Sequence, residues 1–172
     1  MKERILVAGI GNIFLGDDAF GVEVVRELMR RPMSDAVCVK DFGIRSYDLA
    51  YAIMDGYEAT ILVDAVPRGE AAGTLYLIEP DLAGLDEPGN IDAHSMNPVA
   101  VLQLVHALGG QPGKLYLVGC EPDVIETDEI GLSPNVGAAV PRAVEMIESL
   151  IYRLLNENSD RDRPEKGLAK RR

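Results

Sequence analysis

The stretch RILVAGIGNIFLGDDAFG, from Arg4 to Gly21, decides the fold. It begins with an apolar run of Ile, Leu, Val and Ala, which predicts a strand buried on both faces of a parallel sheet. Glycines then supply the permissive backbone that a tight loop after the strand needs. Asp17 and Asp18 follow, and a helical pattern of apolar residues begins at Phe20. The stretch therefore predicts a strand, a tight loop and a helix.

The two aspartates have a simple structural interpretation and a functional one. Either of them could cap the helix, because a carboxylate at a helix start accepts free backbone N–H groups. One carboxylate is enough for that role. The other would stand at the carboxyl end of a buried strand, where open α/β sheets bind ligands. A dinucleotide loop is disfavoured, because the glycine spacing is wrong and two carboxylates would oppose a phosphate.

The composition indicates a single domain with an acidic surface. The chain has 172 residues, 47% of them hydrophobic, which is enough for one sizeable core. We expect this domain at 1–156 and a mobile polar tail at 157–172. The sequence shows neither an apolar stretch of about 18 residues nor a signal-peptide cleavage pattern, so we expect a cytoplasmic protein without a membrane partner. The net charge of −11 argues against nucleic acid and favours a cation or a basic protein segment.

Apolar, β-branched runs alternate with helical patterns along the chain. Strands are predicted at 4–9, 36–42, 59–66, 74–79 and 114–120, and helices from 20, at 47–54, at about 97–108 and from 134. This alternation predicts an α/β domain with three αβα layers. We expect a mainly parallel, twisted five-stranded sheet with helices on both faces.

Two more polar residues occur where strands end or helices begin. Asp64 ends the third predicted strand, where an ionised acid is costly unless it is paired, hydrogen-bonded or bound to a metal. It could instead fasten the turn at Pro67–Gly69. His94 lies in a loop before a helix, where a histidine often makes only a local hydrogen bond. Together with Asp18, these residues form an oxygen and nitrogen set that suits Ni²⁺ or Zn²⁺ and leaves coordination positions open.

Six motifs occur in order along most of the chain. They are GIGNIFLGDDAFG (9–21), DFG (41–43), LVDAV (62–66), AHSM (93–96), VGCEP (118–122) and LSPNV (132–136). In these motifs the chain resembles the nickel–iron hydrogenase maturation endopeptidases, which trim the C-terminus of the hydrogenase large-subunit precursor. The resemblance covers roughly residues 4–155, and the ordered combination is specific where each single motif is weak.

The resemblance implies a site and a substrate. Asp18, Asp64 and His94 would be the catalytic and metal-binding residues, with Asp17 as an open alternative to Asp18. The partner would be a [NiFe]-hydrogenase large-subunit precursor that brings its own Ni²⁺, so nickel would be a recognition element and not a resident cofactor. Nickel would polarise the scissile carbonyl or activate a water, with one carboxylate as general base.

Three other interpretations remain open at this stage. Cys120 with His94 could act as a thiol–imidazole pair, although Cys120 precedes an acid and lacks the electropositive setting that favours a thiolate. The chain could be a nickel-binding chaperone or checkpoint protein of hydrogenase assembly that cuts nothing. It could also be a nickel-independent peptidase with the same fold. Cys38 and Cys120 are expected to be reduced thiols.

Overall fold

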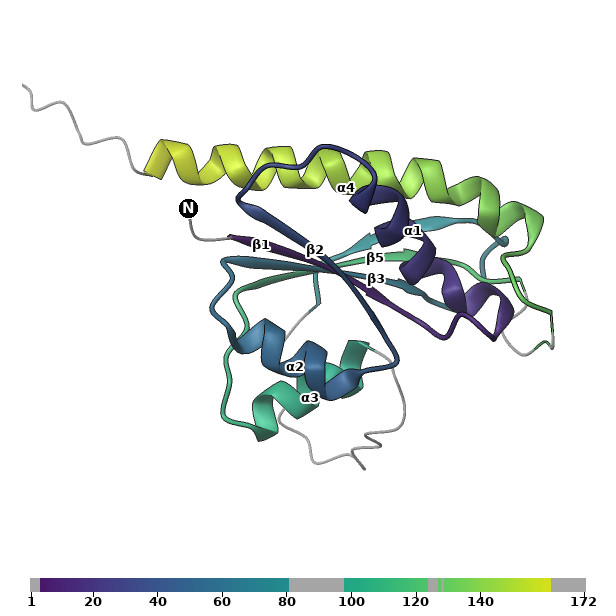
Figure 1. The fold of residues 1–172 in the computed structure, drawn as a ribbon, viewed down its shortest axis with the longest axis horizontal. Coiled ribbons are helices and arrows are strands. Elements are labelled where there is room, and N and C mark those ends of the chain that lie inside the picture. Colours follow the sequence, from purple (N-terminus) through teal and green to yellow (C-terminus); the bar gives the residue numbers. More distant parts are fainter. Residues whose placement is uncertain (1–3, 81–97, 124–126, 128, 162–172) are drawn as a thin grey trace, which may run out of the picture.

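The computed structural model describes residues 4–80, 98–123, 127 and 129–161 (Figure 1). Its strands are β1 (Ile5–Ile10), β2 (Val37–Gly43), β3 (Ala59–Ala65), β4 (Leu75–Ile78) and β5 (Lys114–Cys120). Its helices are α1 (Phe20–Met29), α2 (Ser46–Met54), α3 (Pro98–Ala107) and α4 (Pro134–Arg161), and a 3-10 turn, η1 (Gly16–Ala19), precedes α1. The predicted strands, and the predicted helix ends other than the end of α4, agree with these bounds to within one residue.

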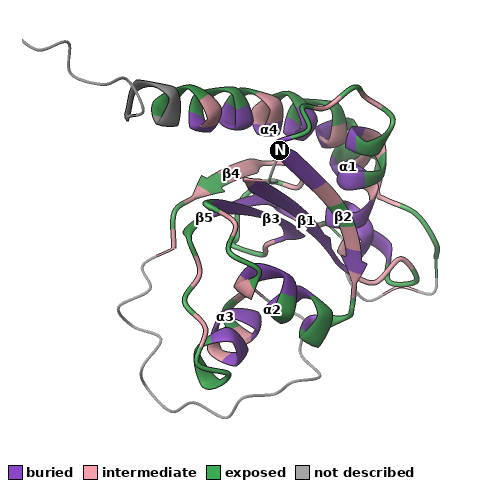
Figure 2. Ribbon diagram, turned by 60° about the vertical axis from the view of Figure 1, so that its left-hand side comes forward, coloured by how far each residue is buried: buried purple, intermediate pink, exposed green. Residues whose placement is uncertain are grey.

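The sheet has the predicted five strands in the order β2-β1-β3-β5-β4. Strands β2, β1, β3 and β5 run parallel, and β4 pairs antiparallel with β5 at one edge. Helices α1 and α4 cover one face, and α2 and α3 cover the other (Figures 1 and 2). The predicted three-layer α/β architecture is therefore confirmed.

The sheet has a separate hydrophobic core on each face. All residues of β1 and β3 are buried (Figure 2). Their side chains alternate between the two helix layers. Val7 and Ile61 face α1 and α4, whereas Leu6 and Leu62 face α2 and α3. In the described part of the chain, no helix is both long and apolar enough to cross a membrane.

Helix α4 extends beyond the predicted domain boundary at residue 156. Helix α4 continues to Arg161, so the first residues of the predicted tail at 157–172 are helical. The apolar stripe does end before Glu157, but polar residues can continue a helix that its earlier turns have nucleated. Ion pairs from Glu157 to Arg153 and Lys114 accompany this extension. Residues 162–172 lie outside the described residues.

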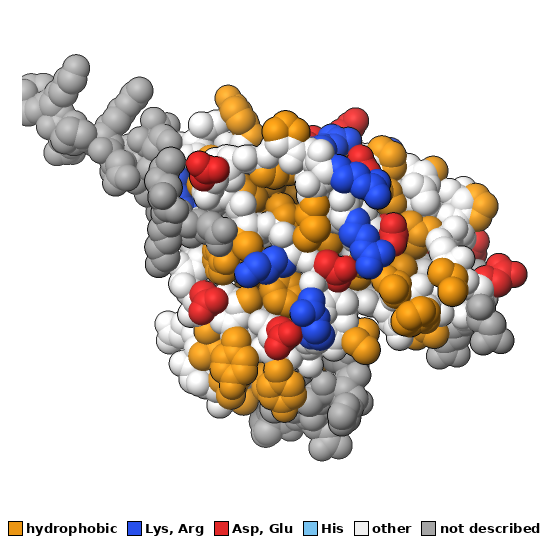
Figure 3. All heavy atoms as spheres, in the orientation of Figure 1, with side chains coloured by type: hydrophobic (Ala, Val, Ile, Leu, Met, Phe, Trp, Pro, Cys, Tyr) orange, Lys and Arg blue, Asp and Glu red, His pale blue; other side chains and the backbone are white. Residues whose placement is uncertain are grey.

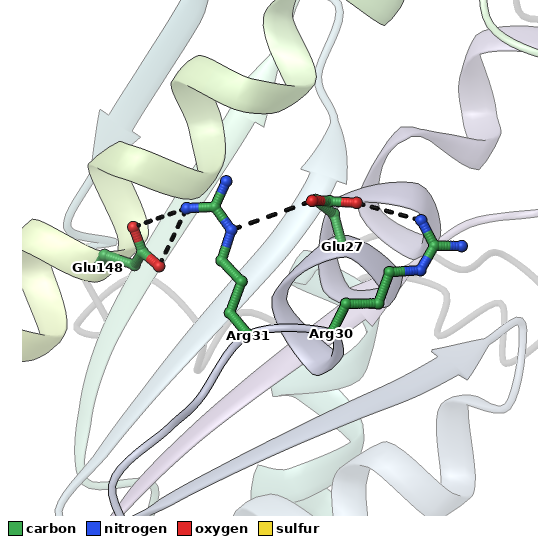
Figure 4. A network of polar contacts seen from close by, with 4 residues as sticks. All are labelled: Glu27, Arg30, Arg31 and Glu148. Carbon is green, nitrogen blue, oxygen red and sulfur yellow. Dashed lines mark hydrogen bonds and ion pairs between the residues drawn. The ribbon is translucent and has the colours of Figure 1, made fainter.

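A chain of charged contacts connects α1 to α4 (Figure 4). Arg31, just after α1, places Nη1 at 3.1 Å from Glu148 Oε2 of α4 and Nε at 4.0 Å from Glu27 Oε1 of α1. Glu27 also pairs with Arg30 at 3.2 Å. Such partly exposed ion pairs contribute little stability individually. Other contacts must therefore stabilise the packing of α1 against the sheet.

Backbone contacts without side chains between them hold α1 against the ends of β1 and β3. A Cβ atom on Gly21 would lie 2.0 Å from Val63 O and 2.4 Å from Ile10 O. A Cβ atom on Gly11, whose φ is +141°, would lie 1.8 Å from Asp18 O. Only glycine allows these approaches. They place η1 and its two aspartates directly over the carboxyl ends of β1 and β3.

Replacing Gly21 by Ala tests this close packing. Because the added methyl group would meet backbone oxygens that cannot rotate away, we expect Gly21→Ala to lower the free energy of unfolding by about 3 kcal/mol. Gly137→Ala in α4 is the matched control, since its Cβ would meet only Leu132 Cβ, at 3.9 Å. There we expect a gain of about 0.5–1 kcal/mol from helix propensity. Urea denaturation measures both, and equal stability of the two variants would contradict the packing argument.

Candidate functional site

Asp17 has a structural role that the sequence did not reveal. It is fully buried, its Oδ1 accepts a hydrogen bond from Ser133 N at 2.7 Å, and its Oδ2 accepts bonds from Ser133 Oγ and Asp123 N, both at 2.8 Å. Its carboxylate thus connects η1 to the start of α4 and to the segment after β5. Capping of α1 is not its role, because the N-cap position of α1 is Ala19, without a side-chain cap bond.

Asp18 points elsewhere and stays partly exposed. Its Oδ2 accepts a hydrogen bond from Asn12 N at 2.8 Å, which orients the carboxylate within the loop after β1. Its negative charge is close enough to Asp64 to raise the pKa of that carboxyl group. The two adjacent aspartates therefore differ: Asp17 connects parts of the fold through hydrogen bonds, and the charge of Asp18 acts on a second acid.

Asp64 is buried at the carboxyl end of β3, as predicted, and is 4% exposed. Because Val63 and Ala65 face α1 and α4, strand alternation places the Asp64 side chain on the α2 and α3 side. Burial first, and then the charge of Asp18, raise its pKa well above the usual range. A hydrogen bond from Ala65 N to Oδ1, at 2.8 Å, opposes this rise in pKa.

Two acids that repel each other at the edge of a sheet fit a divalent cation. A cation between Asp18 and Asp64 would remove both the repulsion and the desolvation cost that raise the pKa of Asp64. Carboxylate oxygens suit such an ion, and an imidazole would shift the preference toward Ni²⁺ or Zn²⁺. Among the described residues there is no group of three or more His, Cys, Asp or Glu that could hold a metal. A metal site with a third protein ligand would need that ligand from another part of the chain.

His94 lies outside the described residues, so its position as the third ligand stays a prediction. The helix that follows it is described. The segment after α3 lies near the amino ends of the strands, since a Cβ on Gly110 would meet Met54 at the end of α2 and one on Gly113 would meet Glu58 O just before β3. The opposite end of α3, at Pro98, therefore faces the carboxyl edge that carries Asp18 and Asp64.

Glu121, and not Asp64, fastens the turn after β3. It is 5% exposed, and its carboxylate accepts hydrogen bonds from Arg68 N at 2.8 Å, Gly69 N at 3.0 Å and Tyr76 Oη at 2.7 Å. The bond from Tyr76, followed by those from the turn, lowers the pKa of Glu121, so it stays ionised. Sequence reasoning missed this role, because the only signal was an acid at the end of a strand in the VGCEP motif.

Cys120 is poorly suited to be a nucleophile. It is buried at the end of β5. Burial, and then the nearby charge of Asp17, raise the pKa of its thiol to about 11. At neutral pH a thiol with such a pKa is almost entirely protonated, whereas covalent catalysis needs the thiolate. The buried environment therefore argues against the thiol–imidazole interpretation.

Comparisons with known proteins agree with this architecture. A family model described as "Hydrogenase maturation protease" matches residues 22–150. The hydrogenase 2 maturation protease of Escherichia coli K12 is 34% identical over 146 residues, which cover 84% of this chain and 88% of that protein.

Solved structures give the same result. The hydrogenase maturating endopeptidase HybD from E. coli superposes with a TM-score of 0.71 at 29% identity, covering 87% of this chain and 93% of HybD. A hydrogenase 2 maturation peptidase from a Thaumarchaeota archaeon has a TM-score of 0.68 at 32% identity, covering 87% of this chain and 98% of its own. With a family model and relatives that span most of its length, this chain belongs to the hydrogenase maturation proteases, a family of endopeptidases.

Proposed function

We propose that this endopeptidase removes the C-terminal extension of a nickel-loaded [NiFe]-hydrogenase large-subunit precursor, and that it recognises the precursor by its nickel. The observation that carries the proposal is the acid pair at the carboxyl edge, in which the charge of Asp18 raises the pKa of the buried Asp64. Such a pair is unfavourable when it is both ionised and empty, so it favours the arrival of a cation. Asp18, Asp64 and His94 would supply the protein ligands.

The difference in exposure between the two acids suits an ion that arrives with a partner protein. Asp18 is partly exposed, so an ion held by a docking protein can reach it, whereas Asp64 is buried. Three protein ligands also leave positions for groups of the precursor. Nickel would polarise the scissile carbonyl or lower the pKa of a water. Asp18 or Asp64 would then accept the proton of the attacking water as general base.

The alternatives are weaker but can be tested by the same experiment. A checkpoint protein that binds nickel without cutting would share the acid pair, yet the chain belongs to a family of proteases. A nickel-independent peptidase of the same fold would have no use for the pair as a cation site. The dependence of cleavage on nickel separates this second alternative from our proposal.

The direct test follows the mass of a large-subunit precursor mixed with the purified protein, with and without nickel. We expect shortening only when nickel is present, and a loss of at least about 10²-fold in rate for Asp18→Asn, Asp64→Asn and His94→Gln. The matched control is His106→Gln. His106 is the other histidine of the chain and lies at the end of α3, and this variant should cut at the normal rate. Cleavage without nickel, or normal cleavage by Asp64→Asn, would refute the proposal.

The acid pair also predicts a pH-dependent stability cost in the metal-free protein. Because the pKa of Asp64 is raised in the folded state, its cost is absent below the usual aspartate pKa of about 4 and grows as the pH rises toward the raised folded-state pKa. Asp64→Asn keeps an oxygen for Ala65 N but removes the charge. We therefore expect Asp64→Asn to melt at the same temperature as the wild type near pH 4 and several degrees higher at neutral pH.

Thermal melts from pH 4 to pH 8 in the presence of a chelator measure this difference. Asp48→Asn serves as control, since Asp48 is exposed and pairs with Arg45 at 3.4 Å. A melting temperature of Asp64→Asn that falls below the wild type as the pH rises would show that the ionised carboxylate is stabilised in the metal-free fold. That result would remove the electrostatic argument for a cation.

A further inference from the structure

Two arginines differ from the others in their surroundings. Six of the arginines whose side chains the structure describes pair with a carboxylate, as Arg30 and Arg31 do in Figure 4. Figure 3 shows the same mixing of basic and acidic side chains on one face of the molecule. Arg68 and Arg142 have no such ion pair within the described part of the chain. Arg142 donates a hydrogen bond to Gly73 O, which leaves Arg68 as the one arginine with a described side chain that has neither a carboxylate partner nor a hydrogen bond from its guanidinium group.

Arg68 is nevertheless held in place from two sides. Its guanidinium carbon lies 5.2 Å from the centre of the Tyr76 ring, within the range of a cation–π contact. Its backbone N donates to Glu121, and the hydroxyl group of Tyr76 donates to the same carboxylate. The backbone of Arg68 and the ring beneath its side chain are thus fixed by one buried acid. A charge that is held by a ring and not by a carboxylate remains free to bind an anion.

Tyr76, whose ring contacts Arg68, lies on the same face of the sheet as Asp64. Asp64 is in register with Gly119 of β5, and Gly119 with Tyr76 of β4. The alternation of β4 places Tyr76 with Ile78 on the α2 and α3 side, which is also the side of Asp64. Two strand spacings of about 4.8 Å separate Asp64 from Tyr76 by about 10 Å.

Between these two residues lies Gly119 of β5, and the side chain of Val66 packs over it. Gly119 has no side chain, and a Cβ atom there would lie 2.8 Å from Val66 Cγ2 and 3.5 Å from Tyr76 Cδ2. A larger residue would push against Val66 and the ring that supports Arg68. The row Asp64, Gly119, Tyr76 therefore connects the acid pair to Arg68 along one edge of the sheet.

We propose that Arg68, supported by Tyr76, is a specificity subsite that binds a carboxylate of the precursor about three to five residues from the scissile bond. The inference rests on the proposed function. The backbones of Asp64 and Tyr76 lie about 10 Å apart, and the Arg68 guanidinium carbon lies 5.2 Å from the Tyr76 ring centre, so about three to five residues of an extended peptide, at about 3.4 Å per residue, span the distance. With a net charge of −11 the protein repels acidic segments in general, and Arg68 provides a local exception. A guanidinium group binds a carboxylate through two parallel hydrogen bonds.

The test compares cleavage of the nickel-loaded precursor by the wild type, Arg68→Gln, Arg68→Glu and Arg68→Lys at low ionic strength. We expect kcat/KM to fall about tenfold for Arg68→Gln and further for Arg68→Glu, mainly through KM, with partial recovery for Arg68→Lys. The loss should shrink at high salt. Arg153→Gln, on the far part of α4, is the matched control and should behave as the wild type. Equal melting temperatures would show that the Arg68 variants are folded.

Changes in the precursor identify the source of the carboxylate. One precursor has the acidic side chains after the cleavage site replaced by their amides, and a second, made by peptide ligation, has an amidated C-terminus. The precursor that lacks the relevant carboxylate should raise the KM of the wild type about tenfold and make Arg68→Gln no worse. If the wild type cuts the precursor and Arg68→Gln has the same KM as the wild type, this inference alone is overturned. A wild type that does not cut would overturn the proposed function and this inference with it.

Discussion

The site depends on the contact of Gly21 with the backbone of two strands. A Cβ atom at this position would lie 2.0 Å from Val63 O and 2.4 Å from Ile10 O, so α1 can start only where it has no side chain. This contact brings η1 against the last residues of β1 and β3. Asp18 then comes close to Asp64, although the two residues are 46 positions apart in the sequence (64 − 18). Backbone packing, and not attraction between side chains, brings the two acids together.

The buried acids of this edge have different roles, which their partners reveal. Asp17 and Glu121 each accept several hydrogen bonds from N–H and O–H groups, so their charges are compensated within the fold. Asp64 accepts a bond from Ala65 N, yet burial and Asp18 still raise its pKa. The first two carboxylates hold loops and helix ends in place. The third has a cost that a cation would remove, and this asymmetry makes Asp64 the candidate for a functional role.

Much of the fold could be predicted from the sequence because its signals are local. Apolar β-branched runs bounded by glycine or proline gave strand limits to within one residue, and Ser133 with Pro134 marked the start of α4. The roles of the acids could not be predicted, because Asp17 and Asp18 look alike and the partner of Asp17 is 116 residues away. The continuation of α4 to Arg161 could not be predicted, because a polar segment lacks the apolar stripe but can still extend a helix.

The account depends on one shared ion at the edge of the sheet. Crystals of the protein soaked in a nickel salt, with diffraction data collected at the nickel absorption edge, test this most directly. We predict one strong anomalous peak, with oxygens of Asp18 and Asp64 and a nitrogen of His94 each at about 2.0–2.3 Å. A peak bound by other residues, or side chains of Asp18 and Asp64 too far apart to share the ion, would contradict the account.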